Sequence, residues 1–452
     1  MRIIIAGVGK AGSTLAKQLS AEGYDLTLID SNQQVLDETI EQYDVMALTG
    51  NCANMAVLKQ AGVTRSDLLI AAAGADEVNL LCCMTAHTMN PNIHTIARIR
   101  NPEYTKQIFQ MRDSFGLSLT VNPENQTARQ IERLLKFPGF LKRESFAKNR
   151  VEIVELRIDA DSKLNGVALQ ALNSIVKCQV LVCVVLRNGN AIMPDGRFIL
   201  REGDRIFVTA DTNVLATLLD NLGIIAHKVK RVMMAGGGRI SYYLAQRLQK
   251  SGISVQIIEK DYNRCLELAE LLPMADIINA DATSHAALES AGLSECDAMI
   301  SLTGMDEMNI VISMYATNDG VSQVITKLGH EENSNILNNL PIGSVICPKE
   351  LCSNTIVRYV RAMRKQSGAA VSVHTIAGGQ AEAVEFLVNT TTKHCNEPLK
   401  NLKTKQNVLI VCISHNGVTE IPNGDSTFQA GDTVIVVTGA DTVLLQLNDI
   451  FE

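Results

Sequence analysis

Short apolar runs alternate with segments of helical periodicity along about the first 140 residues of the chain. The runs predict strands at 3–6, 25–29, 45–48, 68–72, 95–99 and 119–121. The segments between them repeat apolar residues every three to four positions and predict helices at 13–22, 32–42, 55–61 and 77–88. Because continuous apolar strands alternate with helices, we expect a parallel sheet covered by helices on both faces.

The next stretch, of about 80 residues, has a different pattern. Apolar and polar positions alternate at 151–158, as in a half-buried strand, and further strands are expected at 180–186, 191–193 and 205–208. Asn188-Gly189 lies between two of these strands and is typical of a tight hairpin turn. With helices expected at 164–172 and 213–222, this stretch predicts a small α+β domain with antiparallel strands. Pro123 and Pro348 are expected to precede amphipathic helices at 127–135 and 354–363.

The chain repeats itself at a nearly constant offset of about 229 residues. Gly7 corresponds to Gly236, and Leu-Lys-Gln-Ala-Gly at 58–62 corresponds to Leu-Glu-Ser-Ala-Gly at 288–292. We therefore expect two copies of one unit, and four domains at 1–140, 141–225, 226–368 and 369–452. The predicted fold class is α/β, with two Rossmann-like, doubly wound parallel-sheet domains that are each followed by a small α+β domain.

Composition and charge exclude several classes of protein. The 452 residues carry a formal net charge of −7, so no nucleic-acid partner is expected. The longest apolar runs, such as 180–186, are far shorter than the roughly 18 residues of a membrane-spanning helix, and the apolar N-terminal run is too short for a signal peptide. Eleven cysteines without a Cys-x-x-Cys pair are typical of a reducing cytoplasm and predict no zinc knuckle.

The N-terminal turn has the sequence Gly7-Val8-Gly9-Lys10-Ala11-Gly12, which follows a predicted strand directly and opens a predicted helix. Asp30 ends the second predicted strand, and this context matches the dinucleotide-binding fingerprint. We expect Gly7 to allow the tight turn, Gly9 to let the backbone approach a pyrophosphate, and Gly12 to let the helix pack closely on the strand. The helix N-terminus offers N–H groups to the anion, and Asp30 accepts hydrogen bonds from ribose hydroxyls. Because its carboxylate would repel a 2′-phosphate, NAD(H) is the expected cofactor in preference to NADP(H).

The second half carries a degenerate copy of this turn. Gly236, Gly238 and Arg239 keep the pattern, Glu259 takes the place of the acid, and Ser241 stands where the third glycine would be. Glu259 can still hold a ribose, whereas Ser241 is expected to leave the helix further from the strand. Three alternatives remain for this site, namely a dinucleotide, an adenine nucleotide alone, or no ligand.

Further contacts are expected where the other parallel strands end, because ligands bind at the carboxyl ends of such strands. The third strands end at Asn51-Cys52 and at Asp281-Ala282, where the Asn or Asp oxygen can accept from an adenine amino group. The fourth strand ends at Ala73-Gly74, whose small residues suit close contact with a ligand. The fifth ends near Arg98, which can meet a phosphate or can be a solvated or ion-paired charge.

Residues for reaction chemistry do not stand out. The eight histidines do not recur at equivalent positions of the two copies and form no catalytic or metal-ligand spacing: His87, His94, His227, His285, His330, His374, His394 and His415. We therefore expect a non-enzyme with no catalytic residues and no metal site, in which nucleotide occupancy biases a conformational equilibrium.

The two turns, the duplication and the order of the four domains resemble the TrkA family, the tandem RCK (KTN) proteins of Trk-type potassium uptake systems. The resemblance covers essentially all 452 residues. It implies that each unit is a nucleotide-binding RCK N-terminal domain followed by an RCK C-terminal domain. By position, it implies that residues 7–11, Asp30, Ala73, Gly74 and Arg98 contact a dinucleotide at the first site. Asn51 departs from the family, which often has Asp there.

The resemblance also implies a partner and a location. It implies a homotetrameric ring that binds NAD(H) and gates a membrane potassium-translocating subunit of the TrkH or TrkG type. The expected location is the cytoplasm, peripheral on the cytoplasmic face of the inner membrane. Two other functions remain open: an NAD-dependent oxidoreductase, and a regulator of a potassium efflux system.

Overall fold

The computed structural model describes residues 1–137, 139–147, 150–224, 228–329, 340–363, 370–439, 442, 444 and 446–452. These residues form two compact units. Unit 1 comprises Met1–Thr127 and Cys347–Tyr359, and unit 2 comprises Ala128–Ile346 and Val360–Glu452. The domain boundaries expected at 225/226 and 368/369, as well as His227 and His330, lie outside the described residues.

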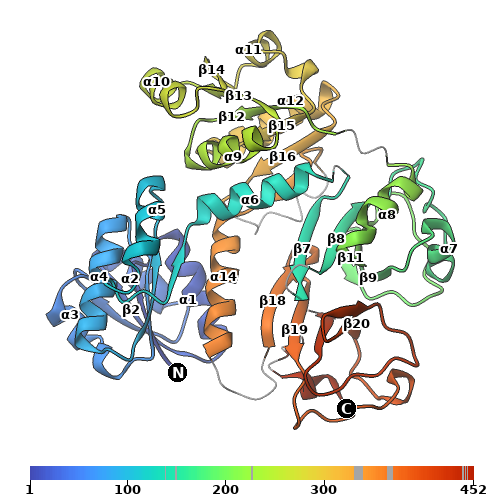
Figure 1. Cartoon of the computed structure of the whole chain (residues 1–452), viewed down its shortest axis with the longest axis horizontal. Helices are drawn as coiled ribbons and strands as arrows, with labels where there is room; N and C mark the ends of the chain where they lie inside the picture. The colour runs from blue at the N-terminus through green and yellow to red at the C-terminus, as the bar shows by residue number, and fades with distance from the viewer. Residues whose placement is uncertain are drawn as a thin grey trace. The chain divides into compact units, whose positions relative to one another are not determined.

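Unit 1 contains a six-stranded parallel sheet (Figure 1). Its order is β3-β2-β1-β4-β5-β6, from β1 (Arg2–Ala6), β2 (Asp25–Asp30), β3 (Met46–Thr49), β4 (Leu68–Ala71), β5 (His94–Arg98) and β6 (Leu119–Val121). Ile5 on the central strand pairs with Leu28 on one side and Ile70 on the other, and all three are buried. The strand order reverses between β1 and β4, and this reversal opens a crevice at the carboxyl ends of the strands.

The helices of unit 1 are α1 (Lys10–Ala21), α2 (Gln33–Ile40), α3 (Met55–Gln60), α4 (Asp76–Met89) and α5 (Pro102–Met111), with the first parts of α6 (Pro123–Leu135) and α14 (Pro348–Met363). Helix α14 comes from the second half of the sequence. Tyr359 on α14 hydrogen-bonds His94 Nδ1 at 3.0 Å, and Gln126 on α6 donates to Thr355 at 3.3 Å. The second half of the chain therefore contributes a helix to unit 1.

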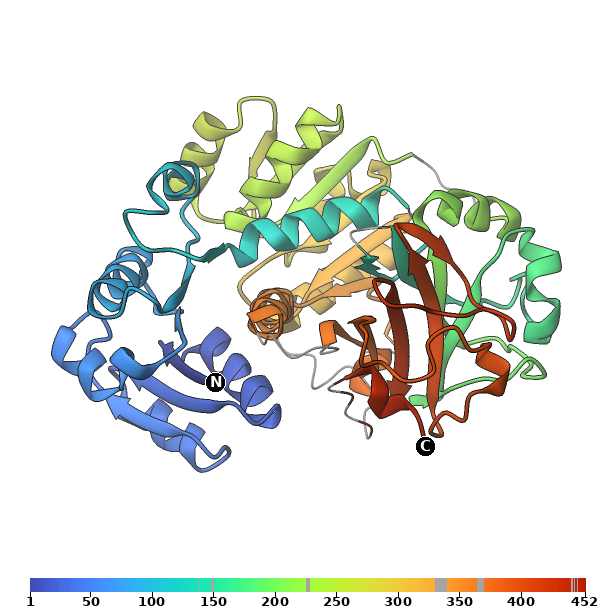
Figure 2. The same cartoon turned by 60° about the horizontal axis from the view of Figure 1, so that its bottom comes forward.

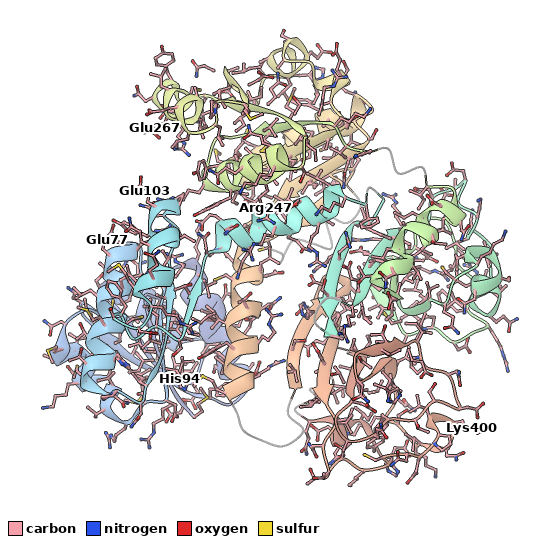
Figure 3. All side chains as sticks on the ribbon, viewed as in Figure 1. Glu77, His94, Glu103, Arg247, Glu267 and Lys400 are labelled. Carbon is pink, nitrogen blue, oxygen red and sulfur yellow. The ribbon has the colours of Figure 1, made fainter. Side chains whose placement is uncertain are left out.

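Unit 2 contains a second six-stranded parallel sheet with the same topology. Its order is β14-β13-β12-β15-β16-β17, from β12 (Arg231–Ala235), β13 (Ser254–Glu259), β14 (Asp276–Asn279), β15 (Ala298–Ser301), β16 (Gln323–Lys327) and β17 (Ser344–Ile346). Its helices include α9 (Arg239–Lys250), α10 (Tyr262–Leu271), α11 (His285–Ser290) and α12 (Asp306–Asn318). Residues of α6 beyond Thr127 belong to this unit. Arg247 on α9, labelled in Figure 3, forms an ion pair with Glu132, and Gln323 donates to the Leu134 carbonyl at 2.9 Å.

Two five-stranded antiparallel sheets complete unit 2. The first, in the order β10-β9-β11-β8-β7, consists of β7 (Lys142–Phe146), β8 (Val151–Arg157), β9 (Leu181–Arg187), β10 (Asn190–Ile192) and β11 (Arg205–Asp211). The second, in the order β18-β19-β22-β20-β21, consists of β18 (Ala370–Ile376), β19 (Ala381–Leu387), β20 (Val408–His415), β21 (Val418–Glu420) and β22 (Thr433–Gly439). Their facing residues share one buried cluster that includes Val184, Phe207, Val411 and Ile435, so the two sheets lie against each other (Figure 2). Helices α7 (Leu172–Val176) and α8 (Leu215–Leu222) cover the first sheet.

The expected fold class is confirmed, but one expected helix is wrong and two others begin earlier than expected. A helix was expected at 164–172, where the structure has turns, a short 3-10 turn at Leu169–Ala171 and then α7. Gly166 has a φ of +78° and Ala168 bridges Ile199, and both features interrupt a helix. Pro123 and Pro348 do not precede their helices but begin them, as proline does when its missing N–H falls in the first turn. No helix in the described part of the chain is both long enough and apolar enough to cross a membrane.

Candidate functional site

The turn between β1 and α1 can be made only with glycine at position 7. Gly7 has a φ of +94°, and its N–H donates to the Ile29 carbonyl at 2.7 Å. A Cβ at this position would lie 2.5 Å from the Ala73 nitrogen at the end of β4. The turn is thus held against the neighbouring strand end, and the chain enters α1 directly afterwards.

The other two glycines of the turn differ in what surrounds them. A Cβ on Gly9 would meet no atom within 4 Å, so the backbone there faces open space. A Cβ on Gly12 would lie 2.0 Å from the Gly7 carbonyl oxygen, so Gly12 serves the packing of α1. Val8 and Ala11 are buried in the turn, whereas Lys10 is exposed in the first turn of α1.

Asp30, at the end of β2, is fixed by two backbone N–H groups, one in the β1–α1 turn and one just after β2. Its Oδ2 accepts from the Val8 N–H at 2.6 Å, and its Oδ1 accepts from the Asn32 N–H at 2.9 Å. Each carboxylate oxygen can accept two hydrogen bonds, so both keep a lone pair for a ligand hydroxyl. The carboxylate is therefore oriented before any ligand binds.

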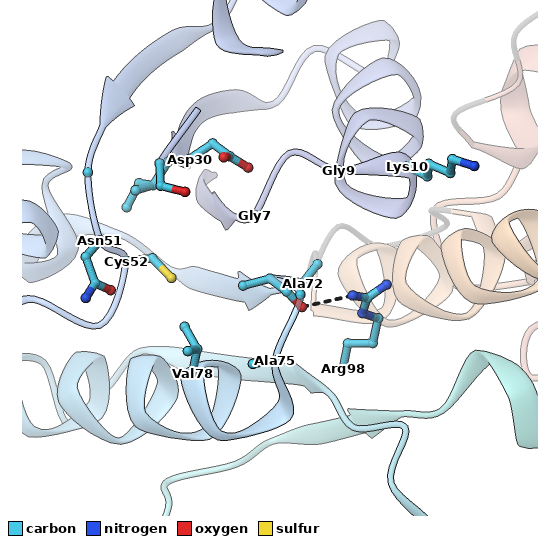
Figure 4. Close-up of a pocket in the computed structure, with 15 residues that line it drawn as sticks. Gly7, Gly9, Lys10, Asp30, Asn51, Cys52, Ala72, Ala75, Val78 and Arg98 are labelled. Atoms are coloured by element: carbon cyan, nitrogen blue, oxygen red, sulfur yellow. Dashed lines mark hydrogen bonds between the residues drawn. The ribbon is translucent and has the colours of Figure 1, made fainter. Parts of the chain in front are cut away.

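These residues line a pocket of about 550 Å³, which is within the usual range for small-molecule sites (Figure 4). Most of the residues predicted for the first site lie around it: Gly7, Gly9, Lys10, Asp30, Asn51, Cys52, Ala73, Gly74 and Arg98. Val8, Ala11 and Gly12 are not among its lining residues. Six further residues, which were not predicted for the site, also line it: Ile29, Ser31, Gly50, Ala72, Ala75 and Val78. Five of the six directly adjoin a named residue where a strand ends, and that adjacency was the available signal.

Arg98, at the end of β5, supplies positive charge on one side of the pocket. One guanidinium nitrogen donates to the Ala73 carbonyl at 2.9 Å, as the dashed line in Figure 4 shows. Its Nε is buried and has no hydrogen-bond partner among the described residues. Burial, with Arg100 nearby, lowers the pKa of Arg98 from its ordinary value. An anionic ligand would relieve this cost of burial, because it would pair with the charge.

Asn79 on α4 joins the ends of β4 and β5. Its Oδ1 accepts from the Ala73 N–H at 2.7 Å, and its Nδ2 donates to the Ala73 and Arg98 carbonyls at 3.2 and 2.9 Å. This fully buried amide fixes the two segments that border the pocket. Asn79 was not predicted as a site residue, because its recurrence as Asn309 in the second half does not by itself show what its side chain contacts.

Cys52 borders the pocket near Asn51. A hydrogen bond with the thiol of Cys82 on α4 lowers the pKa of Cys52, although burial opposes the shift. The same hydrogen bond, together with burial, raises the pKa of Cys82 well above its ordinary value. Cys52 and Cys82 both belong to the buried cluster between the sheet and α4, so they also contribute to the hydrophobic packing there.

The second half repeats the turn. Gly236 has a φ of +98° and donates to the Ile258 carbonyl at 2.8 Å. Glu259 Oε2 accepts from the Gly237 N–H at 2.6 Å, and its Oε1 accepts from the Asp261 N–H at 2.8 Å. The longer glutamate therefore holds the same pair of backbone amides as Asp30 in the first half.

Two side chains make the second turn different. Ser241, in place of the third glycine, is fully buried and donates from its hydroxyl to the Gly236 carbonyl. Arg264 on α10 donates to the Gly237 carbonyl at 2.8 Å and thereby places a guanidinium beside the turn. Gly238 and Arg239, at the start of α9, are exposed.

The remaining predicted residues of the second half, Asp281 and Ala282, follow the end of β14. Asp281 is exposed and Ala282 is buried, and the N–H and hydroxyl of Thr283 both donate to Asp281. These hydrogen bonds, first the one from the Thr283 backbone, lower the pKa of Asp281. Lys327 donates to the Thr303 carbonyl, in the position that Arg98 occupies in the first half.

Together these groups can bind an anion that carries a sugar. The start of α1 offers backbone N–H groups and the positive end of the helix dipole, and Arg98 adds a cation. Asp30 offers lone pairs to hydroxyls, and Val78 and Ala75 offer an apolar wall.

Comparison with known proteins identifies the domains. The model of the TrkA-N domain matches residues 3–123 and 232–348, and the model of the TrkA-C domain matches residues 153–223 and 383–449. The matched segments alternate along the chain, in the order that the repeat predicts.

Curated relatives match over their full length. The Trk system potassium uptake protein TrkA of Haemophilus influenzae is 28% identical over 460 residues, which cover 100% of this chain and 99% of the relative. The Trk system potassium uptake protein TrkA homolog of Archaeoglobus fulgidus is 31% identical over 444 residues, or 98% of each.

Solved structures share the fold at lower identity. The GsuK RCK domain superposes with a TM-score of 0.61 at 16% identity, covering 97% of this chain and 92% of that chain. The GsuK channel bound to NAD superposes with a TM-score of 0.59 at 16% identity, covering 97% of this chain and 77% of that chain.

Proposed function

Because the chain belongs to the TrkA family, with TrkA-N and TrkA-C domains in tandem, we propose that it is a nucleotide-binding regulatory subunit of a potassium uptake system. The observation that carries the proposal is the pocket at the β1–α1 turn, in which Asp30 is oriented by two backbone amides. The relatives named as Trk system potassium uptake proteins support the assignment to potassium transport.

NAD(H) is the proposed ligand of the first site. The pyrophosphate would lie at the start of α1, where Gly9 leaves open space, and Arg98 would add a charge to it. The adenosine ribose would donate to the free lone pairs of Asp30, and Asn51 would face the adenine. NADP(H) is disfavoured because its 2′-phosphate would meet the Asp30 carboxylate. The NAD-bound GsuK channel, which shares the fold, supports this choice of ligand.

An adenine nucleotide is the proposed ligand of the second site. Glu259 keeps an acid that would hold a ribose, and two backbone N–H groups equivalent to those that donate to Asp30 donate to it. Arg264 brings a cation beside the turn, which suits terminal phosphates. The proposed contacts are Gly236, Gly238, Arg239, Glu259, Asp281 and Ala282.

The protein would act on a membrane partner. We propose that it forms a homotetrameric ring on the cytoplasmic face of the inner membrane and gates a potassium-translocating subunit of the TrkH or TrkG type. Nucleotide binding would change the free-energy difference between two states of the ring, by as much as the nucleotide's binding free energy differs between those states. In this scheme the bound nucleotide is an effector and is not consumed.

Potassium flux through membranes that contain the translocating subunit tests the proposal. The wild-type chain is compared with Asp30→Ala and with Asp37→Ala, an exposed carboxylate of α2 that does not line the pocket. We expect flux to depend on the added chain and on NAD(H), and Asp30→Ala alone to remove the nucleotide dependence. Flux that is indifferent to both the chain and the nucleotide would overturn the gating role.

A further inference from the structure

Three potential metal ligands meet at one end of two helices in the second parallel-sheet domain. His285 is the first residue of α11, Glu289 lies one turn later on the same face, and Asp319 caps the C-terminus of α12. One ligand atom of each lies within 4.8 Å of the others. His285 Nε2 is already 2.7 Å from Asp319 Oδ2.

The surroundings hold two of these side chains in place and leave the third adjustable. The imidazole of His285 packs on the Tyr315 ring, with the ring centroids 4.9 Å apart. The side chains of His285 and Asp319 are 37% and 15% exposed, so an ion could reach them from solvent. Glu289 is exposed and can change rotamer without disturbing the core.

The distances are close to those that a metal requires. Ligand atoms at about 2.1 Å from a tetrahedral Zn²⁺ lie roughly 3.4 Å from one another. The contact between His285 and Asp319 would have to open slightly, and Glu289 would have to move inward. Both changes are small rotations about side-chain bonds.

The duplicated fold provides an internal comparison. The positions equivalent to His285, Glu289 and Asp319 are Met55, Lys59 and Met89 in the first half, where α3 and α4 correspond to α11 and α12. Both copies bury the same leucine of the shorter helix, Leu58 and Leu288. The fold therefore does not need the three ligand residues, and the first copy has none of them.

We propose that His285, Glu289 and Asp319 bind a divalent transition-metal cation, with Zn²⁺ as its representative. One imidazole nitrogen and two carboxylate oxygens suit Zn²⁺ and leave a fourth position for water. Ca²⁺ and Mg²⁺ are disfavoured because they require more oxygen ligands and rarely accept imidazole. The bound ion would clip the start of α11 to the end of α12. No metal site was expected from the sequence, because the histidines show no metal-ligand spacing, and His285 and Asp319 lie 34 positions apart in the chain.

Zn²⁺ titration of the full-length chain tests this proposal. Metal-stripped protein is titrated in a calorimeter and, separately, against a chelating dye, with Mg²⁺ and Ca²⁺ in parallel runs. Accessible cysteines are alkylated first, since Cys178, Cys296 and Cys395 are partly exposed and could hold zinc themselves. We expect one Zn²⁺ site per chain, a rise in melting temperature on adding Zn²⁺, and much weaker binding of Mg²⁺ and Ca²⁺.

The test variants are taken from the residues that the first half carries at the equivalent positions. His285→Met and Glu289→Lys introduce the residues that the other copy carries at these positions, and circular dichroism checks that they fold. Each is expected to weaken Zn²⁺ binding at least tenfold and to abolish the thermal shift. His394→Met is the matched control, because His394 pairs with Glu397 at 3.1 Å outside the three-ligand group. Zn²⁺ binding that survives both test variants, or that is lost in the control, would show that the metal is held elsewhere and would overturn the proposal.

Discussion

Replacement of Asp30 by asparagine separates the role that its hydrogen bonds show, which is to hold the turn, from the role proposed for it, which is to bind the ribose. In the folded chain, one oxygen of Asp30 accepts from the Val8 N–H at 2.6 Å and the other from the Asn32 N–H at 2.9 Å. Asparagine keeps one acceptor and replaces the other by an NH₂ group, which cannot accept. One of these two backbone N–H groups therefore loses its partner in Asp30→Asn, and the charge that would face the ribose disappears.

The expected loss of affinity follows from these hydrogen bonds. A hydrogen bond to a charged group contributes about 1.5–3 kcal/mol, and a ribose offers two hydroxyls to the carboxylate. Allowing for the acceptor that remains, we expect NAD(H) binding to weaken by about 3 kcal/mol, or roughly 150-fold. The partner variant Glu259→Gln makes the same chemical change in the second half, where Glu259 accepts from Gly237 and Asp261. It is expected to leave NAD(H) affinity at the first site unchanged.

Isothermal titration with NAD⁺, NADH and NADPH measures both roles. If Asp30 meets the ribose, Asp30→Asn reduces the preference for NADH over NADPH, because the carboxylate no longer repels the 2′-phosphate. If Asp30 only holds the turn, both cofactors weaken equally. A loss of NADH affinity below about threefold, with an unchanged melting temperature, would refute the placement of the ribose at Asp30.

Other substitutions test the turn and the ion pairs. Gly7→Ala should lower the free energy of unfolding by about 2–4 kcal/mol in urea titrations, because its Cβ would clash with the end of β4. Gly9→Ala should leave stability unchanged, because its Cβ would meet no atom of the chain, and should weaken NAD(H) binding at least tenfold. Glu152→Gln should lower the urea midpoint of unit 2 by an amount equivalent to about 3 kcal/mol. Two arginines donate to this buried carboxylate, and one of them would be left buried without a counter-charge. Burial raises the pKa of Glu132, but the hydrogen bonds from Arg247 and a neighbouring lysine outweigh burial and hold this pKa below its ordinary value. The contribution of the ionised Glu132 to stability is therefore present at neutral pH and is lost as pH falls through the lowered pKa. The melting temperature of Glu132→Gln should therefore be below that of the wild type at pH 7, and the difference should narrow as pH falls through the lowered pKa of Glu132. A difference that stays constant through acid titration would contradict the ion pair.

The sequence predicted the parallel sheets well because their pattern is local. Each strand is a short apolar run, and the repeat supplies every element twice. Helix α5 was missed, although the sequence carries its start signals: Asn101 caps it by accepting from the Glu103 N–H, and Pro102 occupies its first position. The contribution of α14 to unit 1 could not be predicted either, since the contact of Tyr359 with His94 joins residues 265 positions apart.

Residues of the site could be predicted where the position requires one particular type of residue. Gly7, with its positive φ, and Asp30, at a strand end, are such residues. Asn79 and the Cys52–Cys82 contact were not predictable, because they depend on how α4 packs against the strand ends. Their roles come from tertiary packing, which periodicity does not report.

The third position of the turn shows how the two copies of one fold can diverge in binding. In the first half a Cβ on Gly12 would lie 2.0 Å from the Gly7 carbonyl, so that helix and turn are in contact through glycine. In the second half Ser241 occupies this position, and its hydroxyl donates to the Gly236 carbonyl. A Cβ on Gly236 would find its nearest neighbour at 3.0 Å, against 2.5 Å for Gly7, so the second turn is also less tightly packed against the next strand end. The third glycine is therefore a requirement of the close helix packing in the first half and not of the fold. Because that packing sets where the helix N-terminus meets an anion, this difference supports the proposal that the two halves hold different nucleotides on the same scaffold.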